Sequence, residues 1–201
     1  MAHSIELLFD HHTDTALRRV WDALTEAGVP SQNRVLSPTN RPHVTLVVAD
    51  RLDPAVDAEL VSLADQLPLA CLLGAPLVFG PPPKPTHGPE SASNSGNFVG
   101  LGEPDSRGRF TLAHLIVPSA ELLELHRRIH QICAPHLTPG PAPHSVPGSW
   151  TAHATLGRRF TGAQLGTAFA AVPDLTGERR ASFVGLRRWD GDKRIEHVLL
   201  S

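Results

Sequence analysis

The tetrapeptide His-x-Thr-Leu occurs twice in this chain, at residues 43–46 and 153–156. A neutral imidazole can take a proton from an attacking hydroxyl or water, and a protonated one can give a proton to a departing oxygen. Because the ordinary histidine pKa is near 6.5, both forms coexist near neutral pH. The threonine hydroxyls can donate hydrogen bonds to phosphate oxygens. Two copies around one phosphorus would therefore support phosphoryl transfer without a metal, with a bell-shaped pH profile.

Both copies lie in segments that are predicted to be β-strands. Side chains alternate along a strand, so His43 and Thr45 share one face, and His153 and Thr155 share another. One copy alone would be an ordinary strand sequence. The two copies fall at corresponding places in two halves of the chain, and this favours a function over coincidence. Four apolar residues are expected to point the other way into a core: Val44, Leu46, Ala154 and Leu156.

The remaining segments predict an α+β chain of two similar lobes related by a pseudo-two-fold. Each lobe is expected to be a small, mostly antiparallel sheet with helices outside, with the site in a cleft between them. Residues 1–201 are interpreted as a single bilobal domain. The predicted helices span 14–30, 53–67, 119–137 and 161–172. The predicted strands span 4–9, 43–49, 69–80, 97–102, 109–118 and 151–157, with a hairpin at 179–201 that turns at Asp190-Gly191.

Two segments rich in proline, serine and glycine are predicted to be loops, at 81–96 and 138–149. The first is long and is expected to be mobile. We interpret it as a surface insertion in preference to a lid over the site.

Composition limits the classes of function. The 201 residues include 41% hydrophobic residues, enough for a buried core, and the formal net charge is −2. This charge argues against gripping long nucleic acid by bulk electrostatics, but not against a small phosphate-bearing substrate. We find no signal peptide and no apolar run of about 18 residues, so a cytoplasmic protein is expected. Cys71 and Cys133 are interpreted as buried free thiols.

The segments "PHVTL" at 42–46 and "HATLGR" at 153–158 resemble the motifs of the 2H phosphoesterase superfamily. Its bacterial members include the proteins called 2′-5′ RNA ligases or RNA 2′,3′-cyclic phosphodiesterases. The resemblance implies that His43 and His153 are the acid/base pair. It also implies that Thr45 and Thr155 bind the phosphate and that Arg158 helps to bind the substrate. Strand alternation would place Arg158 on the face opposite His153, so its role requires the strand to end or twist there.

The resemblance further implies a phosphodiesterase that opens 2′,3′-cyclic phosphates of nucleotides or RNA ends, or cleaves 2′,5′-phosphodiester links, with a ligase-type reverse reaction in one branch of the family. Such an enzyme needs no cofactor or metal. We expect a monomer without an obligatory protein partner or membrane contact, and a nucleotide or RNA end as its substrate. Either histidine could be the base.

Two alternatives belong to other classes of function. A noncatalytic module could keep the fold and bind a nucleotide or RNA end, although the intact motifs argue against this. A metal-binding protein is also conceivable, because the chain has 12 histidines. His126 and His130 have a usable helical spacing for a metal, but we interpret them as solvated helix residues. His11 and His12 are interpreted as a loop pair.

The few aromatic residues are interpreted as core rather than as stacking platforms for a base. Arg41, which precedes the first motif, could line the cleft. The aromatic residues considered are Phe9, Trp21, Phe98 and Trp150.

Overall fold

The computed structural model describes residues 2–80 and 110–201. These residues form eight strands and four α-helices. The strands are β1 (His3–Phe9), β2 (His43–Leu52), β3 (Leu69–Phe79), β4 (Phe110–Ile116), β5 (Leu137–Pro141), β6 (His153–Phe160), β7 (Arg179–Asp190) and β8 (Ile195–Leu200). The helices are α1 (His11–Glu26), α2 (Val56–Leu60), α3 (Ala120–Cys133) and α4 (Gly162–Ala171).

All eight strands belong to one hydrogen-bonded sheet with the order β5-β2-β1-β7-β3-β4-β6, and β8 pairs with β7. Each of these pairings is antiparallel. The expected α+β class with a mostly antiparallel sheet is therefore confirmed. The expectation of two separate sheets is corrected, because β7 pairs with β3 and joins the strands into one sheet. The pseudo-two-fold stays a prediction.

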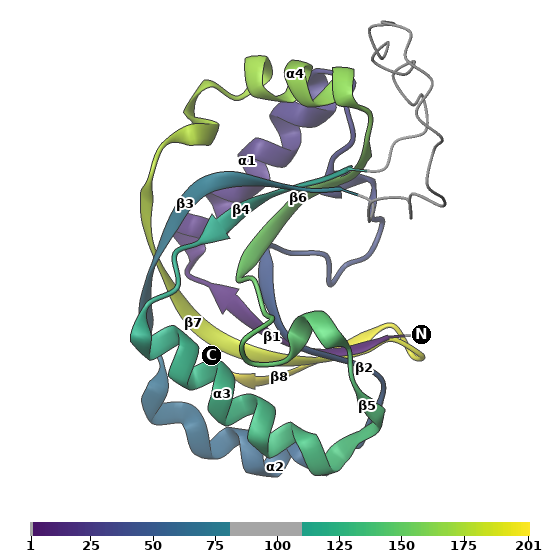
Figure 1. Cartoon of the computed structure of the whole chain (residues 1–201), viewed down its shortest axis with the longest axis vertical. Helices are drawn as coiled ribbons and strands as arrows, with labels where there is room; N and C mark the ends of the chain where they lie inside the picture. The colour runs from purple at the N-terminus through teal and green to yellow at the C-terminus, as the bar shows by residue number, and fades with distance from the viewer. Residues whose placement is uncertain (1, 81–109) are drawn as a thin grey trace, which may run out of the picture.

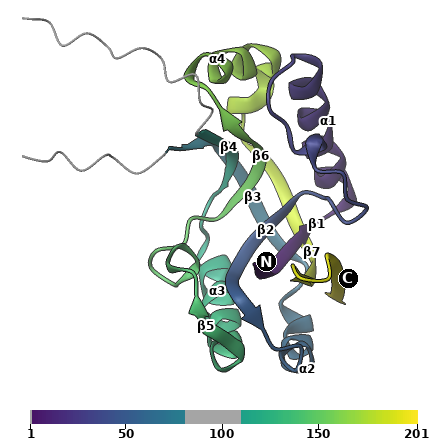
Figure 2. The same cartoon turned by 90° about the vertical axis from the view of Figure 1, so that its right-hand side faces the viewer.

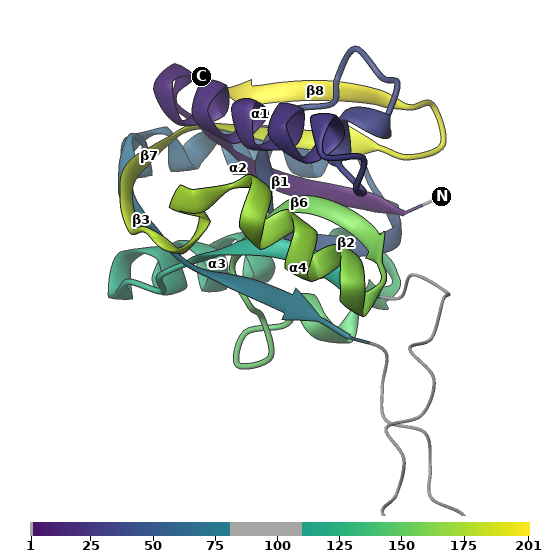
Figure 3. The same ribbon diagram turned by 90° about the horizontal axis from the view of Figure 1, so that it is seen from above.

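The sheet is strongly curved, so its distant strands come together in space (Figure 1). β2 and β6 are not neighbours in the hydrogen-bonded order, yet they lie in contact (Figures 1 and 2). α1 and α4 pack against β6 and each other, whereas α3 packs against β2 and α2 (Figures 1 and 3). β6 is thus covered by α1 and α4, whereas β2 is covered by α3, against which α2 packs.

The helices begin where the sequence provides caps. The side chain of Asp10 accepts from the Thr13 backbone N–H at the start of α1, and Ser119 does the same for Leu122 at the start of α3. The apolar face of α1 is buried through Leu17, Trp21 and Leu24, which recur at helical spacing. α1 is thereby fixed against the sheet next to β6.

Most predicted elements are present, with four differences. The segment 53–67 forms only the short α2 followed by a 3₁₀ turn at Val61–Gln66. The predicted loop 138–149 contains most of β5, a strand that pairs with β2. His11 and His12 open α1 instead of lying in a loop. Cys71 and Cys133 are both free, but Cys71 is only half-buried. The predicted loop 81–96, the predicted strand 97–102 and Phe98 lie outside the described residues.

No helix within residues 2–80 and 110–201 is long and apolar enough to span a membrane.

Candidate active site

Each His-x-Thr-Leu sequence carries a β-bulge at its leucine. In β2, Val47 is opposite Ile5 and Thr45 is opposite Glu6, so Leu46 is the extra residue. In β6, Gly157 is opposite Leu112 and Thr155 is opposite Ala113, so Leu156 is the extra residue. Val44, Leu46, Ala154 and Leu156 are all buried, as expected from the alternation. The two motifs therefore share a local backbone irregularity as well as a sequence.

The bulge in β6 decides where Arg158 points. Thr155 and Arg158 are opposite Ala113 and Thr111 of β4, and residues two apart on a strand share a face. The extra residue therefore brings Arg158 onto the face of His153 and Thr155, which simple alternation would not allow. Arg158 lines the same pocket as His43.

Two tryptophans hold the threonine carbonyls of the two motifs. Trp150 donates from Nε1 to the carbonyl oxygen of Thr45 at 2.9 Å, and Trp21 donates from Nε1 to that of Thr155 at 3.3 Å. Trp150 precedes β6 and bonds to β2, whereas Trp21 lies in α1 and bonds to β6. Trp150 thus links β2 to the segment before β6, and Trp21 links β6 to α1. Neither link is a strand pairing of the sheet.

His126 supports the bulge of β2 from the buried side. Its Nε2 lies 3.1 Å from the Leu46 carbonyl oxygen and 3.0 Å from that of Ser145, and its ring stacks on Trp150 at 4.0 Å between centroids. The side chain is buried, and burial is the main cause of its lowered pKa. The interpretation of His126 as a solvated residue is therefore wrong. His126 and His130 join no group of three or more potential metal ligands within the described residues.

The two motif histidines are anchored in the same way. His43 Nδ1 lies 2.7 Å from the Arg41 carbonyl oxygen, and His153 Nδ1 lies 2.7 Å from the Thr151 carbonyl oxygen. Because a carbonyl oxygen only accepts, Nδ1 must carry the proton in each ring. This fixes the tautomer and leaves Nε2 of each histidine available for proton transfer.

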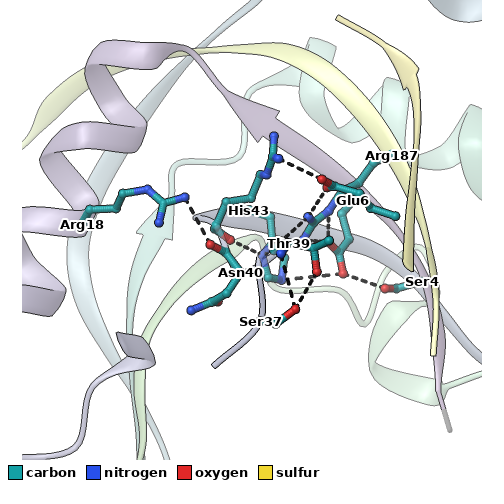
Figure 4. A network of polar contacts seen from close by, with 10 residues as sticks. Ser4, Glu6, Arg18, Ser37, Thr39, Asn40, His43 and Arg187 are labelled. Carbon is teal, nitrogen blue, oxygen red and sulfur yellow. Dashed lines mark hydrogen bonds and ion pairs between the residues drawn. The ribbon is translucent and has the colours of Figure 1, made fainter. Parts of the chain in front are cut away.

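The surroundings of His43 are rich in buried charge (Figure 4). Its Nε2 lies 3.7 Å from Glu6 Oε1, which also accepts from the Ser4 hydroxyl at 2.6 Å. The other Glu6 oxygen accepts from Arg187 Nε at 2.7 Å. Burial acts to raise the pKa of Glu6, but the charges of His43 and Arg187 outweigh it, so the Glu6 pKa is lowered. Glu6 is therefore a buried carboxylate beside His43.

Arg187 connects this carboxylate to its neighbours. Its Nη1 donates to Glu196 at 2.6 Å and to the Thr39 carbonyl oxygen at 2.8 Å. Arg41, which sequence reasoning placed near the cleft, pairs with Glu196 at 2.8 Å. The buried guanidinium of Arg187 is thus shared between two carboxylates.

His153 lies in a different environment. Burial is the main cause of its lowered pKa, and the positive charges of Arg158, His43 and His144 lower it further. Its ring also lies against Phe79, with 4.7 Å between centroids. His43 and His153 are therefore close enough to interact electrostatically, but among residues 2–80 and 110–201 a carboxylate accompanies only the first.

A pocket of about 760 Å³ opens beside His43. Its lining includes Glu6, Arg158, Arg187 and Trp189 together with residues of the segment 32–40. Thr45, His153 and Thr155 are half-buried on the neighbouring strands and are not part of this lining. A separate hollow of about 690 Å³ around Asp10 and Cys71 contains none of the predicted site residues.

Sequence reasoning missed Glu6, Arg187 and Trp189. A single carboxylate in the apolar stretch "SIELLF" was the one available signal for Glu6. Nothing local marked Arg187, whose partner Glu6 is 181 positions away. Trp21 is buried as expected, and Trp150 and Phe9 also pack in the core.

Comparison with known proteins gave no family. Neither a family model nor a curated protein sequence matches the chain. Among solved structures, that of Kluyveromyces marxianus Usb1 matches with a TM-score of 0.49 and 13% identity, covering 100% of this chain and 98% of that one. The structure of the same protein with uridine monophosphate matches with a TM-score of 0.49 and 14% identity, covering 100% and 97%. A likeness at this level does not reveal what this chain binds or catalyses.

Proposed function

We propose that this chain is a metal-independent phosphodiesterase that uses His43 and His153 as an acid/base pair on a cyclic or 2′,5′-linked nucleotide phosphate. The main support is the equivalent anchoring of the two imidazoles. Both are held through Nδ1 by a carbonyl oxygen 2.7 Å away, on bulged strands that contact each other. The resemblance of the motifs to the 2H phosphoesterases supports the same reaction.

The charges around the two rings suggest which histidine takes which role. His153 has a lowered pKa, so it is neutral near pH 7 and suited to accept a proton. His43 can form its ion pair with Glu6 only when its ring is protonated, and this suits it to give a proton. The surroundings therefore favour His153 as the base and His43, beside the Glu6 carboxylate, as the acid.

The reaction on a 2′,3′-cyclic phosphate follows from these roles. Nε2 of His153 takes a proton from water as the water oxygen bonds to phosphorus. The bond from phosphorus to the ribose 3′ oxygen breaks, and Nε2 of His43 protonates that oxygen. The product is a 2′-phosphate with a free 3′-hydroxyl. Thr45, Thr155 and Arg158 would hold the non-bridging oxygens as negative charge builds up.

The test is hydrolysis of a panel of 2′,3′-cyclic nucleotides in EDTA from pH 5 to 9. We expect turnover to the 2′-phosphate, read by phosphorus NMR. His43→Ala and His153→Ala should each reduce kcat by about a hundredfold or more, because each removes one proton-transfer group. His12→Ala is the matched control, since His12 is exposed on α1 and should leave the rate unchanged.

The pH profile of kcat/KM is a second expected result. His153 must be neutral to act as the base, so activity is lost as the pH falls through its pKa. Because that pKa is lowered, the acid side of the profile should lie below the usual histidine value near 6.5. Equal turnover in the three histidine variants would disprove the assignment. Binding without turnover would indicate a noncatalytic nucleotide-binding module.

A further inference from the structure

The three tryptophans of the chain are used differently. Trp21 and Trp150 donate their indole N–H groups to the carbonyl oxygens of Thr155 and Thr45. The indole of Trp189 forms no hydrogen bond and no ring contact with the described residues, and Trp189 lines the pocket beside His43. An indole that supports nothing inside the protein is available to a ligand.

The register of β7 places Trp189 on the face of the site. Arg187 is opposite Glu6 of β1, and Trp189, two residues further on, is opposite Ser4. Side chains two apart on a strand share a face, so the indole lies on the same side of the sheet as the charged group beneath His43. Trp189 and the proposed acid therefore belong to one continuous surface.

The other wall of this pocket is apolar and exposed. Leu36 is 97% exposed and Val35 is 50% exposed, and both line the pocket. Their segment is fastened to the site, because Arg187 donates to the Thr39 carbonyl oxygen and Arg18 donates to that of Asn40 at 3.2 Å (Figure 4). Exposed apolar side chains that line the same pocket as Arg158 and Arg187 suit a flat, partly apolar ligand group.

We propose that the pocket between Trp189 and the segment 35–38 is a nucleobase subsite, with the base stacked on the indole and its phosphate directed toward Arg158 and His43. The pocket volume of about 760 Å³ lies in the range of small-molecule sites. An aromatic platform favours a nucleotide over a cyclic phosphate of a plain sugar or polyol. This inference rests on the proposed function and names the residues that would hold the base of its nucleotide substrate.

Binding can test the subsite without turnover. The probes are adenosine 2′-monophosphate and ribose 5-phosphate, which lacks the base, and the readouts are tryptophan fluorescence and calorimetry. The wild-type chain should bind the nucleotide about tenfold more tightly than the sugar phosphate, with fluorescence quenching by the stacked base. Trp189→Leu should remove most of the quenching and weaken nucleotide binding about tenfold, but leave the sugar phosphate unaffected.

Two further variants keep the test interpretable. Trp189→Phe retains a stacking ring and should recover most of the affinity for the nucleotide. Phe169→Ala removes an exposed aromatic side chain of α4 outside the pocket and should change nothing. Equal affinity for the two probes, unchanged nucleotide binding by Trp189→Leu, or no binding of either probe would overturn the subsite. The phosphodiesterase proposal would still be judged by the histidine variants.

Discussion

Glu6 carries a buried negative charge beside His43. Within residues 2–80 and 110–201, no carboxylate forms a corresponding ion pair with His153. The two histidines share a motif, a tautomer and a bulged strand, so their sequence alone does not distinguish them. The charged neighbours do, because a carboxylate lies beside Nε2 of His43, whereas the positive charge of Arg158 helps to lower the pKa of His153. A carboxylate on β1 thus distinguishes the two histidines, and it supports His43 as the acid and His153 as the base of the proposed reaction.

Replacing Glu6 with Gln tests this assignment of acid and base. The substitution keeps the shape of the side chain but removes the charge that faces His43 Nε2. We expect kcat at neutral pH to fall about tenfold, a cost of about 1.4 kcal/mol in the transition state. The measurement is kcat/KM from pH 5 to 9.

Glu196→Gln is the matched control for this variant. Each substitution removes one of the two carboxylates of Arg187, so both should lower the stability of the fold. Only Glu6 also lies beside His43 Nε2. If Glu196→Gln changed the pH profile as much as Glu6→Gln, the effect would have to act through Arg187 and not through the charge on His43.

The sequence predicts individual site residues where a pattern repeats. His43 and His153 were found because the same four letters occur twice on predicted strands. Their charged neighbours were not found, since Arg187 reaches Glu6 through a strand pairing across 181 positions. Nothing in the local sequence marks Trp189, because its place beside the pocket depends on the register of β7 with β1.

The bulge in β6 depends on a glycine. A Cβ on Gly157 would lie 2.5 Å from the Pro30 carbonyl oxygen and 2.8 Å from the Phe160 ring. Neither group can move easily, because one is backbone and the other is a buried side chain. Gly157 therefore allows the close approach that sets the direction of Arg158, the next residue.

Gly157→Ala should consequently disturb the end of β6. We expect a loss of about 1–3 kcal/mol in the free energy of unfolding, by analogy with overpacked cores. KM should also rise as Arg158 is displaced. Gly166→Ala in α4 is the control, since its Cβ would have nothing within 4 Å and alanine favours a helix. Denaturant unfolding measures the free energy of unfolding of both variants. Equal stability of Gly157→Ala and Gly166→Ala would contradict this role of Gly157.

The elements were predictable where the hydrophobic period is clear, as in α1 and α3. β5 was missed because Pro139, Gly140 and Pro141 read as a loop. The strand tolerates them because it lies at the edge of the sheet and pairs only with β2. The bulges at Leu46 and Leu156 have no signature in the sequence either, because they depend on the register of the neighbouring strand.

Several histidines are held in the neutral form by the fold as a whole. The pKa values of His114, His126, His130 and His153 are lowered, in each case chiefly by burial. A group with a lowered folded pKa stabilises the fold fully above its unfolded value, near 6.5 for histidine. That stabilisation is lost as the pH falls toward the folded pKa.

The melting temperature should therefore fall between pH 7.5 and pH 5.5, a window above the ordinary pKa of the carboxylates. We expect a drop of several degrees, at about 2–4 °C for each kcal/mol in a chain of this size. His126→Gln can still donate to the Leu46 and Ser145 carbonyl oxygens but cannot be protonated, so its drop should be smaller. Calorimetry at pH 7.5 and pH 5.5 measures the melting temperature of both proteins. A melting temperature of the wild-type chain that does not change would refute the expectation.

At the scale of the molecule, the sequence predicted the α+β class but not the single sheet. The link between the two groups of strands is the pairing of β7 with β3. That pairing depends on residues at the far end of the chain, and no local period reveals it.

The place of β7 has a consequence for synthesis of the chain on the ribosome. β7 lies at the centre of the sheet order, between β1 and β3, yet among the described strands only β8 follows it in sequence. A nascent chain can pair β1 with β2 and β3 with β4 early, but the two groups cannot be hydrogen-bonded into one sheet before residues 179–190 emerge. The ion pair between Glu6 and Arg187 likewise cannot form before β7 has been made. The proposed site is therefore assembled only after residues 179–190 have been made, and chains that stop before them would lack it.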